Sequence, residues 1–179
     1  MSARSDRYAL LLRAINVGGR KLPMADLRAL LTELGHTDVK TILASGQAVV
    51  TSDRAGDEIA TELEKRLADD FGLRSEVMVR SGVQLAAIVA ANPYPTAEDD
   101  GARHAVVFLR QKASAVQVKP LQAQDWGADE YAVHGTEIYL RLPQGFAESK
   151  LSLAVGRIKG VPATTRNWNT VRKLANLTA

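Results

Sequence analysis

The stretch Tyr8-Ala-Leu-Leu-Leu-Arg13 is a short apolar run with the length and composition of a buried β-strand. A glycine-rich turn follows, and Pro23 then stands where a helix can begin, because its missing N–H would have no helical partner there in any case. Apolar residues at helical spacing continue over 24–34, and Gly35 ends the pattern. These residues predict a strand and a helix joined by a polar loop.

Working outward from this pair, the apolar spacing predicts further elements before residue 95. They are strands over 39–44 and 47–52 joined by a turn at Ser45-Gly46, a helix over 57–71, a strand over 74–80, and a helix that begins at a Ser81–Gln84 capping box. Asn92-Pro93 ends the last helix, because a residue that precedes proline avoids helical backbone angles.

The same order of elements starts again after an acidic segment, 96–102, which we interpret as a linker. The second series consists of a strand over 104–109, a helix over 113–121 that contains Pro120, strands over 130–133 and 137–142, a helix over 149–157, an extended segment over 161–166 and a helix capped by Asn167. Each half has the order β-α-β-β-α-β-α, and its first six elements form the ferredoxin-like pattern. We predict an α+β fold of two ferredoxin-like βαββαβ halves, over 1–95 and 103–179, each with an added helix and an antiparallel sheet packed on helices.

The composition of the 179 residues is that of a globular protein, with 46% hydrophobic and 24% charged residues. The chain has no cysteine, which excludes disulfides, thiolate metal sites and a cysteine nucleophile, and which fits the reducing cytoplasm where we expect the protein. Its first apolar run, 8–12, is too short for a signal peptide or a membrane span, so we expect no membrane partner. The three histidines lack metal-ligand spacing, and we expect no metal and no cofactor.

Charge is distributed unevenly along the chain. The net charge is +3, yet residues 1–21 carry +4 and residues 149–179 carry +6, which leaves −7 for the segment between them. Such an asymmetry is typical of a protein with an anion-binding face. The alternative interpretation is that the two basic ends are solvated surface.

The first basic segment, 13–21, lies between the first strand and the first helix. The backbone N–H groups of Gly18 and Gly19, the positive end of the helix dipole and the cations Arg13 and Lys21 would suit a phosphate or a carboxylate. The glycine spacing matches neither a P-loop nor a dinucleotide-binding loop, so it does not predict a known nucleotide site. The alternative is a Gly-Gly turn with solvated basic neighbours.

The second basic segment, Thr164 to Thr170, also lies where a strand meets a helix. Asn167 is suited to cap that helix. An indole at Trp168 beside Arg166 and the amide of Asn169 would suit the recognition of a base or another planar ligand. The alternative is that Trp168 fills the seam between the halves and Arg166 pairs with an acid.

Taken together, these motifs resemble the bacterial family known as domain of unknown function 1697. The resemblance rests on Arg13 to Met24, Ser45-Gly46, Asn92-Pro93-Tyr94, Ser149-Lys150 and Thr165 to Thr170, and it runs from about Tyr8 to Leu177. It implies a two-part α+β protein of ferredoxin-like character without an established activity. Two departures from the family pattern are Ala14, where glycine is usual, and Gln47, where asparagine is usual.

We predict a ligand-binding site and assign no catalytic residue. On the motifs and the resemblance, the predicted site consists of Arg13, Asn16, Gly18, Gly19, Lys21, Ser45, Ser149, Lys150, Arg166, Asn167 and Asn169. The expected ligand is an anion that bears a phosphate or a carboxylate, such as a small metabolite or a nucleotide. Nucleic acid is a further possible partner, although only 5% of the residues are aromatic, which disfavours base reading on a stacking platform.

Two other functions stay open on the sequence. The same cations could bind the substrate of an enzyme, with a lysine of lowered pKa as the base, since no histidine or carboxylate belongs to the predicted site. The polar motifs could instead hold the fold together in a structural or interaction module. The sequence predicts neither the identity of the ligand nor the oligomeric state.

Overall fold

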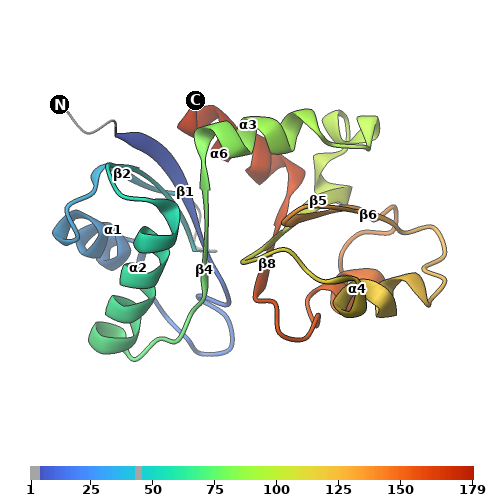
Figure 1. The fold of residues 1–179 in the computed structure, drawn as a ribbon, viewed down its shortest axis with the longest axis horizontal. Coiled ribbons are helices and arrows are strands. Elements are labelled where there is room, and N and C mark those ends of the chain that lie inside the picture. The colour runs from blue at the N-terminus through green and yellow to red at the C-terminus, as the bar shows by residue number, and fades with distance from the viewer. Residues whose placement is uncertain (1–4, 43–45) are drawn as a thin grey trace. The chain divides into compact units, whose positions relative to one another are not determined.

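The computed structural model describes residues 5–42 and 46–179 (Figure 1). The backbone divides into two compact units. The first consists of Met1–Ala87 and Leu174–Ala179, and the second of Ile88–Lys173. The boundaries therefore fall inside two helices, α3 (Gly82–Ala90) and α6 (Trp168–Thr178). The predicted limits 1–95, 96–102 and 103–179 remain a prediction.

The first unit contains one four-stranded antiparallel sheet with the order β2-β3-β1-β4. Its elements are β1 (Asp6–Leu12), α1 (Met24–Glu33), β2 (Thr37–Ile42), β3 (Gln47–Ser52), α2 (Gly56–Phe71) and β4 (Val77–Ser81), followed by α3. The central strand β1 pairs with β3 on one side and β4 on the other, with Leu10 opposite both Ala48 and Val79. This order is the one that a ferredoxin-like βαββαβ unit requires.

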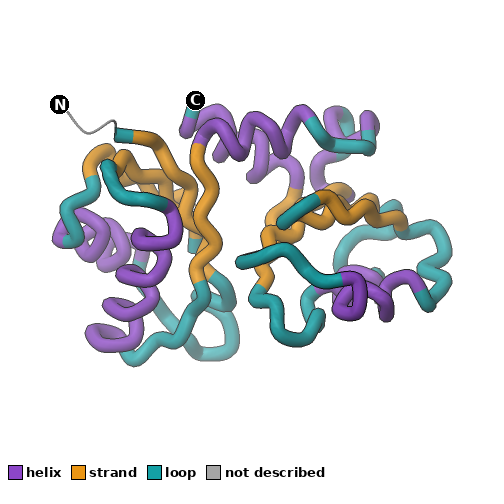
Figure 2. The backbone as a smooth tube through the Cα atoms, in the orientation of Figure 1, coloured by secondary structure: helices purple, strands orange, loops and turns teal. Residues whose placement is uncertain are grey.

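Helices α1 and α2 cover one face of this sheet (Figures 1 and 2). Alternate strand residues such as Leu10 and Leu12 are buried against the helices, where they meet Leu27 of α1 and Leu63 of α2. The helix pattern places its apolar residues on one stripe, and the strand pattern places every second residue on one face. Burial of these side chains is the main stabilising contribution to the unit.

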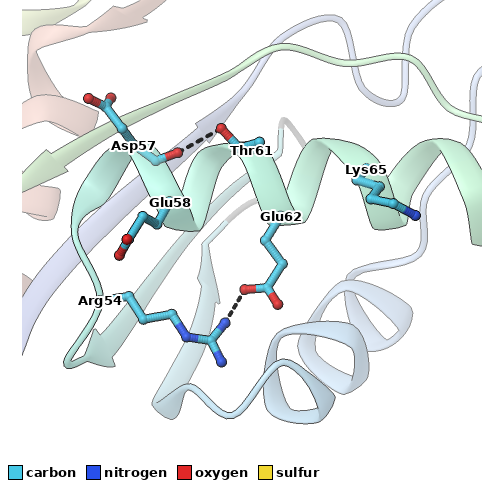
Figure 3. Close-up of a pocket in the computed structure, with 6 residues that line it drawn as sticks. All are labelled: Arg54, Asp57, Glu58, Thr61, Glu62 and Lys65. Carbon is cyan, nitrogen blue, oxygen red and sulfur yellow. Dashed lines mark hydrogen bonds and ion pairs between the residues drawn. The ribbon is translucent and has the colours of Figure 1, made fainter.

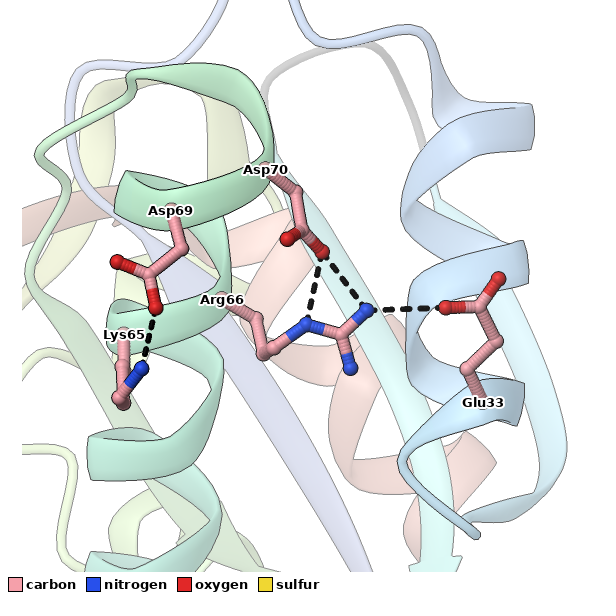
Figure 4. A network of polar contacts seen from close by, with 5 residues as sticks. All are labelled: Glu33, Lys65, Arg66, Asp69 and Asp70. Atoms are coloured by element: carbon pink, nitrogen blue, oxygen red, sulfur yellow. Dashed lines mark hydrogen bonds and ion pairs between the residues drawn. The ribbon is translucent and has the colours of Figure 1, made fainter.

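Charged residues on the outside also connect α1 to α2 (Figure 4). The guanidinium of Arg66 donates hydrogen bonds to Glu33 of α1, at 3.0 Å, and to Asp70 of its own helix, at 2.7 Å. Lys65 pairs with Asp69 one turn further along α2. Because these groups are exposed, each pair contributes little to stability, about 0–1 kcal/mol.

The second unit repeats the arrangement with the sheet order β6-β7-β5-β8. Its elements are the 3-10 helices η1 (Pro95–Glu98) and η2 (Gly101–Arg103), then β5 (His104–Leu109), α4 (Ala115–Gln122), β6 (Glu130–His134), β7 (Glu137–Arg141), α5 (Lys150–Val155) and β8 (Ala163–Asn167), followed by α6. The predicted α+β fold with two antiparallel sheets is thus confirmed. The segment that we interpreted as a linker, 96–102, contains most of η1 and most of η2.

Two helices of the second unit are shorter than the sequence predicts. Helix α4 begins after Ser114, whose hydroxyl accepts a hydrogen bond from the Gln117 N–H at 3.3 Å, and it retains Pro120 in its interior. Helix α5 ends at Val155, and Gly156 follows as its C-cap. None of the helices in the described ranges is both long enough and apolar enough to cross a membrane.

Candidate functional site

The loop between β1 and α1 is shaped by the side chain of Asn16. Its amide nitrogen donates to the Leu22 carbonyl at 3.2 Å, and its amide oxygen accepts from the Leu22 N–H at 2.8 Å. Asn16 itself has φ +59°, a left-handed conformation that asparagine tolerates better than most residues. The predicted site residue Asn16 therefore closes the loop into a fixed shape.

The two glycines of the loop permit its backbone path. Gly18 has φ +59° and Gly19 has φ +84°, and a Cβ added at either position would meet no atom within 4 Å. Glycine is thus favoured at these two positions because it adopts the left-handed backbone conformation easily, and not because a larger side chain would collide with a neighbour. Ala14, where the family pattern has glycine, is also left-handed, with φ +53°.

Arg13 is fastened to the segment that leads into β4. Its N–H donates to the Glu76 carbonyl at 3.0 Å, and its own carbonyl accepts from the Ser75 hydroxyl at 2.7 Å. The Arg13 guanidinium also lies 3.7 Å from the Glu76 carboxylate, with both side chains more than a third exposed. This cation is partly neutralised, so it is a weaker anion ligand than its position in the sequence indicated.

Arg20 and Lys21 are the exposed cations of the loop. Within residues 5–42 and 46–179, neither side chain forms an ion pair. Both lie just before Pro23, the N-cap of α1, which provides no side-chain cap for that helix. Positive charge is unfavourable at this end of a helix because the dipole is positive there as well.

Gly46, directly before β3, adjoins the same loop. The Leu12 N–H donates to the Gly46 carbonyl at 2.8 Å. A Cβ at Gly46 would lie 3.1 Å from the Ile15 Cβ, and Gly46 has φ +81°, so glycine is required here for space and for conformation. The structure thus brings Gly46 next to Ile15 of the first basic segment. The predicted site residue Ser45 lies outside the described residues.

In the second unit, Arg166 is held on β8. It is 9% exposed, and its guanidinium donates to the Thr164 hydroxyl at 2.7 Å and to the Thr165 carbonyl at 2.9 Å. Burial lowers the pKa of Arg166 to about 10. The group nevertheless keeps its charge at neutral pH.

The residues after Arg166 connect α6 to η1 and η2. The Asn167 side chain accepts from the Thr170 N–H at 2.9 Å, as predicted for a helix cap. Trp168 is 1% exposed, and its indole N–H donates to Glu98 at 3.1 Å. Asn169 packs on Gly101, where an added Cβ would lie 2.2 Å from the Asn169 amide oxygen.

Ser149 and Lys150 begin helix α5 and have separate roles. The Ser149 hydroxyl accepts from the Ser152 N–H at 2.9 Å and donates to the Asp129 carboxylate at 2.7 Å. It is therefore the N-cap of α5, and its proton is held by Asp129. Lys150 is exposed and forms no ion pair in the part of the chain that the structure describes.

Comparison with known proteins supplies the family. A family model described as "Protein of unknown function (DUF1697)" matches residues 6–139. The chain belongs to this family. A conserved bacterial protein from Streptococcus pneumoniae has the same fold, with 24% sequence identity, a TM-score of 0.81, and coverage of 98% of this chain and 99% of that one. No curated protein matches the chain.

The DUF1697 match covers the first loop and ends at Tyr139. It thus includes Arg13, Asn16 and Lys21 but not Ser149 or the second basic segment. The predicted site residues consequently fall into two groups, one in each unit. The structure gathers Arg13, Asn16, the glycines and Lys21 in one loop of the first unit, and Arg166, Asn167 and Asn169 along β8 and α6 of the second. That the two groups belong to one site remains a prediction.

Two other hollows on this DUF1697 protein contain polar groups that bond to neighbouring groups of the same unit. The pocket along α2 in Figure 3 is shallow, and its Arg54 pairs with Glu62. A hollow of about 330 Å³ in the second unit includes His104, which bonds through one ring nitrogen to the Thr96 hydroxyl at 2.9 Å and through the other to the Asp100 carbonyl at 2.7 Å. Because a carbonyl can only accept, Nδ1 of His104 carries the proton in the neutral ring.

Sequence reasoning missed one groove of the DUF1697 chain altogether. It is lined by α4, the end of α5 and the residues up to Lys159. No motif marks it, because its walls come from segments about 40 positions apart in the sequence. The one signal in the helix pattern is Val116, an apolar residue that the structure shows to be 79% exposed.

Proposed function

We propose that the protein binds a small anionic ligand, one that bears a phosphate or a carboxylate, at the loop 13–21. The single observation that carries the proposal is the position of Arg20 and Lys21. Both side chains are exposed, and neither is in an ion pair among the described residues. Both stand within three residues of the N-cap Pro23.

Electrostatics favour an anion at this loop. Two cations beside a helix N-terminus repel the positive end of the dipole, and the first turn of α1 offers one acid, Asp26, to offset them. A bound anion would be attracted by the cations and by the dipole together. The loop is also shaped in advance, because the Asn16 side chain holds Leu22 at both backbone groups. A preorganised loop loses little conformational entropy on binding.

The test is a titration of the protein with inorganic phosphate and with acetate, followed by the backbone amide resonances. We expect saturable shifts centred on Gly18, Gly19 and the first turn of α1. The double substitution Arg20→Gln with Lys21→Gln is expected to weaken binding at least tenfold, because it removes both cations without changing the loop-closing residue Asn16.

A matched control is Lys112→Gln with Lys119→Gln in the second unit, which lowers the net charge equally. That variant should bind as the parent does. Equal loss of affinity in both double variants would show a general charge effect, and an absence of shifts in the loop at high phosphate would refute the site. A single-stranded oligonucleotide titration at several salt concentrations tests the nucleic-acid version, which requires a steep fall of affinity with salt.

A second candidate, a structural role, applies to the basic segment of the second unit. Asn167 caps α6, Trp168 bonds to Glu98, and Ser149 caps α5 while it bonds to Asp129. These contacts favour a role in holding the second unit together. Substitutions there would then lower stability without an effect on ligand binding at loop 13–21. Catalysis by Lys150 paired with the adjacent Ser149 stays the weaker hypothesis, since the Ser149 hydroxyl already donates to the Asp129 carboxylate.

A further inference from the structure

A groove of about 420 Å³ lies in the second unit, along α4 and the segment that follows α5. This volume is within the usual range of small-molecule sites, about 300–1,000 Å³. Five of its lining residues are apolar, namely Val116, Pro120, Leu121, Ala154 and Ile158. The apolar part of the lining would suit the hydrocarbon part of a ligand.

We propose that this groove binds a small amphipathic anion, a molecule with an apolar body and one carboxylate or phosphate head. Arg157 and Lys159 are the charged residues of the lining, and no acid accompanies them among the described lining residues. Both are exposed, and neither belongs to an ion pair in the described parts of the chain. The groove is thus charge-complementary to an anion and not to a cation or a neutral polar molecule.

The N-terminus of α4 adds to this positive potential. Val116 and Gln117 stand in the first turn of α4 and line the groove. The N-terminal N–H groups of a helix and its dipole attract negative charge. The head group is therefore placed near the N–H groups of this turn, and the apolar body extends over Val116 toward Pro120 and Leu121 on the following turn.

The wall of the groove is rigid because the side chain of Gln117 is bonded at both ends. Its amide oxygen accepts from the Ser114 N–H at 2.8 Å, and its amide nitrogen donates to the Lys159 carbonyl at 3.0 Å. A Cβ at Gly160 would lie 3.2 Å from that nitrogen, so the chain passes close to α4 here. The backbone at Lys159 is thus fixed, and the cation extends from a fixed position.

Exposure of apolar surface at the rim supplies a driving force. Val116 is 79% exposed, although it is a β-branched apolar residue in a lining position. Covering this side chain with the apolar body of a ligand would remove hydrophobic surface from water, which is favourable in proportion to the area covered. A purely ionic ligand would leave that surface exposed. The proposal therefore requires both parts of the ligand.

Trp126 provides a reporter for this groove. Its indole N–H donates to the Leu121 carbonyl at 2.8 Å, and Leu121 lines the groove. The chain has one other tryptophan, Trp168, whose indole bonds to Glu98. We expect sodium octanoate or octyl phosphate to shift the Trp126 indole ¹⁵N–¹H resonance saturably and to leave the Trp168 resonance in place.

Probes that lack one part of the ligand separate the two requirements. Inorganic phosphate should leave the Trp126 resonance unmoved, and octanol or octyltrimethylammonium should bind at least tenfold more weakly than octanoate. Comparison of octanoate with octyl phosphate identifies the preferred head group. Equal affinity for the cationic and anionic probes, or a shift that never saturates, would overturn the proposal.

Substitutions complete the test. Arg157→Gln with Lys159→Gln should weaken octanoate binding at least tenfold, and Val116→Asp should do the same through the rim. Lys112→Gln with Lys119→Gln, and Arg20→Gln with Lys21→Gln, should leave it unchanged. Unaltered amide spectra away from the groove establish that each variant is folded. Undiminished binding in the Arg157/Lys159 variant refutes this site, whereas loss in the Arg20/Lys21 variant would assign the effect to loop 13–21 instead.

Discussion

The indole N–H of Trp168 donates a hydrogen bond to the carboxylate of Glu98, 3.1 Å away. The second oxygen of the same carboxylate pairs with Arg172 at 2.7 Å. Glu98 is the last residue of η1, and its two partners stand one turn apart on α6. One carboxylate thus attaches the segment before β5 to the last helix of the chain.

Removal of this carboxylate should be destabilising. Glu98→Ala leaves the buried indole donor without its partner, and we expect the free energy of unfolding to fall by about 1–3 kcal/mol. Glu98→Gln retains an acceptor for the indole and should lose less than half of that. Urea unfolding followed by circular dichroism measures both changes. Equal stability of the parent and Glu98→Ala would contradict the role of Glu98 as the attachment point.

Two substitutions of Asn16 should separate the cost of backbone strain at this position from the cost of losing the hydrogen bonds that close the loop. Asn16→Ala loses two hydrogen bonds and places alanine at φ +59°, so we expect a loss of about 1–3 kcal/mol in the free energy of unfolding. Asn16→Gly loses the same bonds without the conformational strain. The glycine variant should therefore be the more stable of the two, and the reverse order would contradict the left-handed assignment.

Gly82 cannot be enlarged without moving α6. A Cβ at this position would lie 2.2 Å from the Thr178 carbonyl oxygen, which belongs to the backbone and cannot rotate away. Gly82→Ala is expected to lower the melting temperature by several degrees or more, in line with the cost of overpacking, about 1–3 kcal/mol. Gly127→Ala is a useful comparison, since a Cβ there meets no atom within 4 Å and only the strain of φ +65° is added.

Stability should decrease with acidification because of His36. The ring is 3% exposed, and burial, followed by the nearby Arg54, lowers the pKa of His36 below its ordinary value. The unfolded chain takes up a proton near pH 6.5 and the folded chain only at a lower pH. The buried, neutral imidazole of His36 therefore does not reduce the stability above about pH 6.5. Below that pH the free energy of unfolding declines, because the unfolded chain binds the proton more readily than the folded chain.

The variant His36→Phe tests that assignment. Unfolding free energies measured between pH 8 and pH 5 should show a smaller loss in the variant than in the parent, because the imidazole no longer contributes. His134→Phe is the control, because His134 is exposed. This substitution should leave the dependence of the unfolding free energy on pH unchanged. Identical slopes for the parent and His36→Phe would sink the explanation.

Sequence patterns predicted the fold well because the information they carry is local. The apolar stripes that include Leu10, Leu27 and Leu63 gave each element its type, and the repeated order gave the sheet topology. Asn167 could be predicted as a helix cap because capping acts within three residues. The ends of helices were predicted less accurately. Helix α4, for example, begins one residue after its capping Ser114 and continues past Pro120.

The contacts of the predicted site residues could not be inferred from the sequence, because their partners are distant in sequence. The pairing of Arg13 with Glu76 and of Ser149 with Asp129 joins positions far apart in sequence, and no spacing rule connects them. These partners reduce the freedom of side chains that the sequence presented as available for a ligand. The groove beside Gln117 was invisible for the same reason, since its second wall begins at Ala154.

The assignment of Leu174–Ala179 to the first unit has a consequence for biosynthesis. The end of α6 lies against Gly82, and the Arg7 guanidinium donates to the carbonyl of Ala179 at 3.1 Å. The ribosome makes these residues only after Ile88–Lys173, so the first unit can complete its structure only once the whole second unit has been synthesised. Nascent chains that stop short of Leu174 should therefore carry a first unit that is unfinished, although nearly all of its sequence was made first.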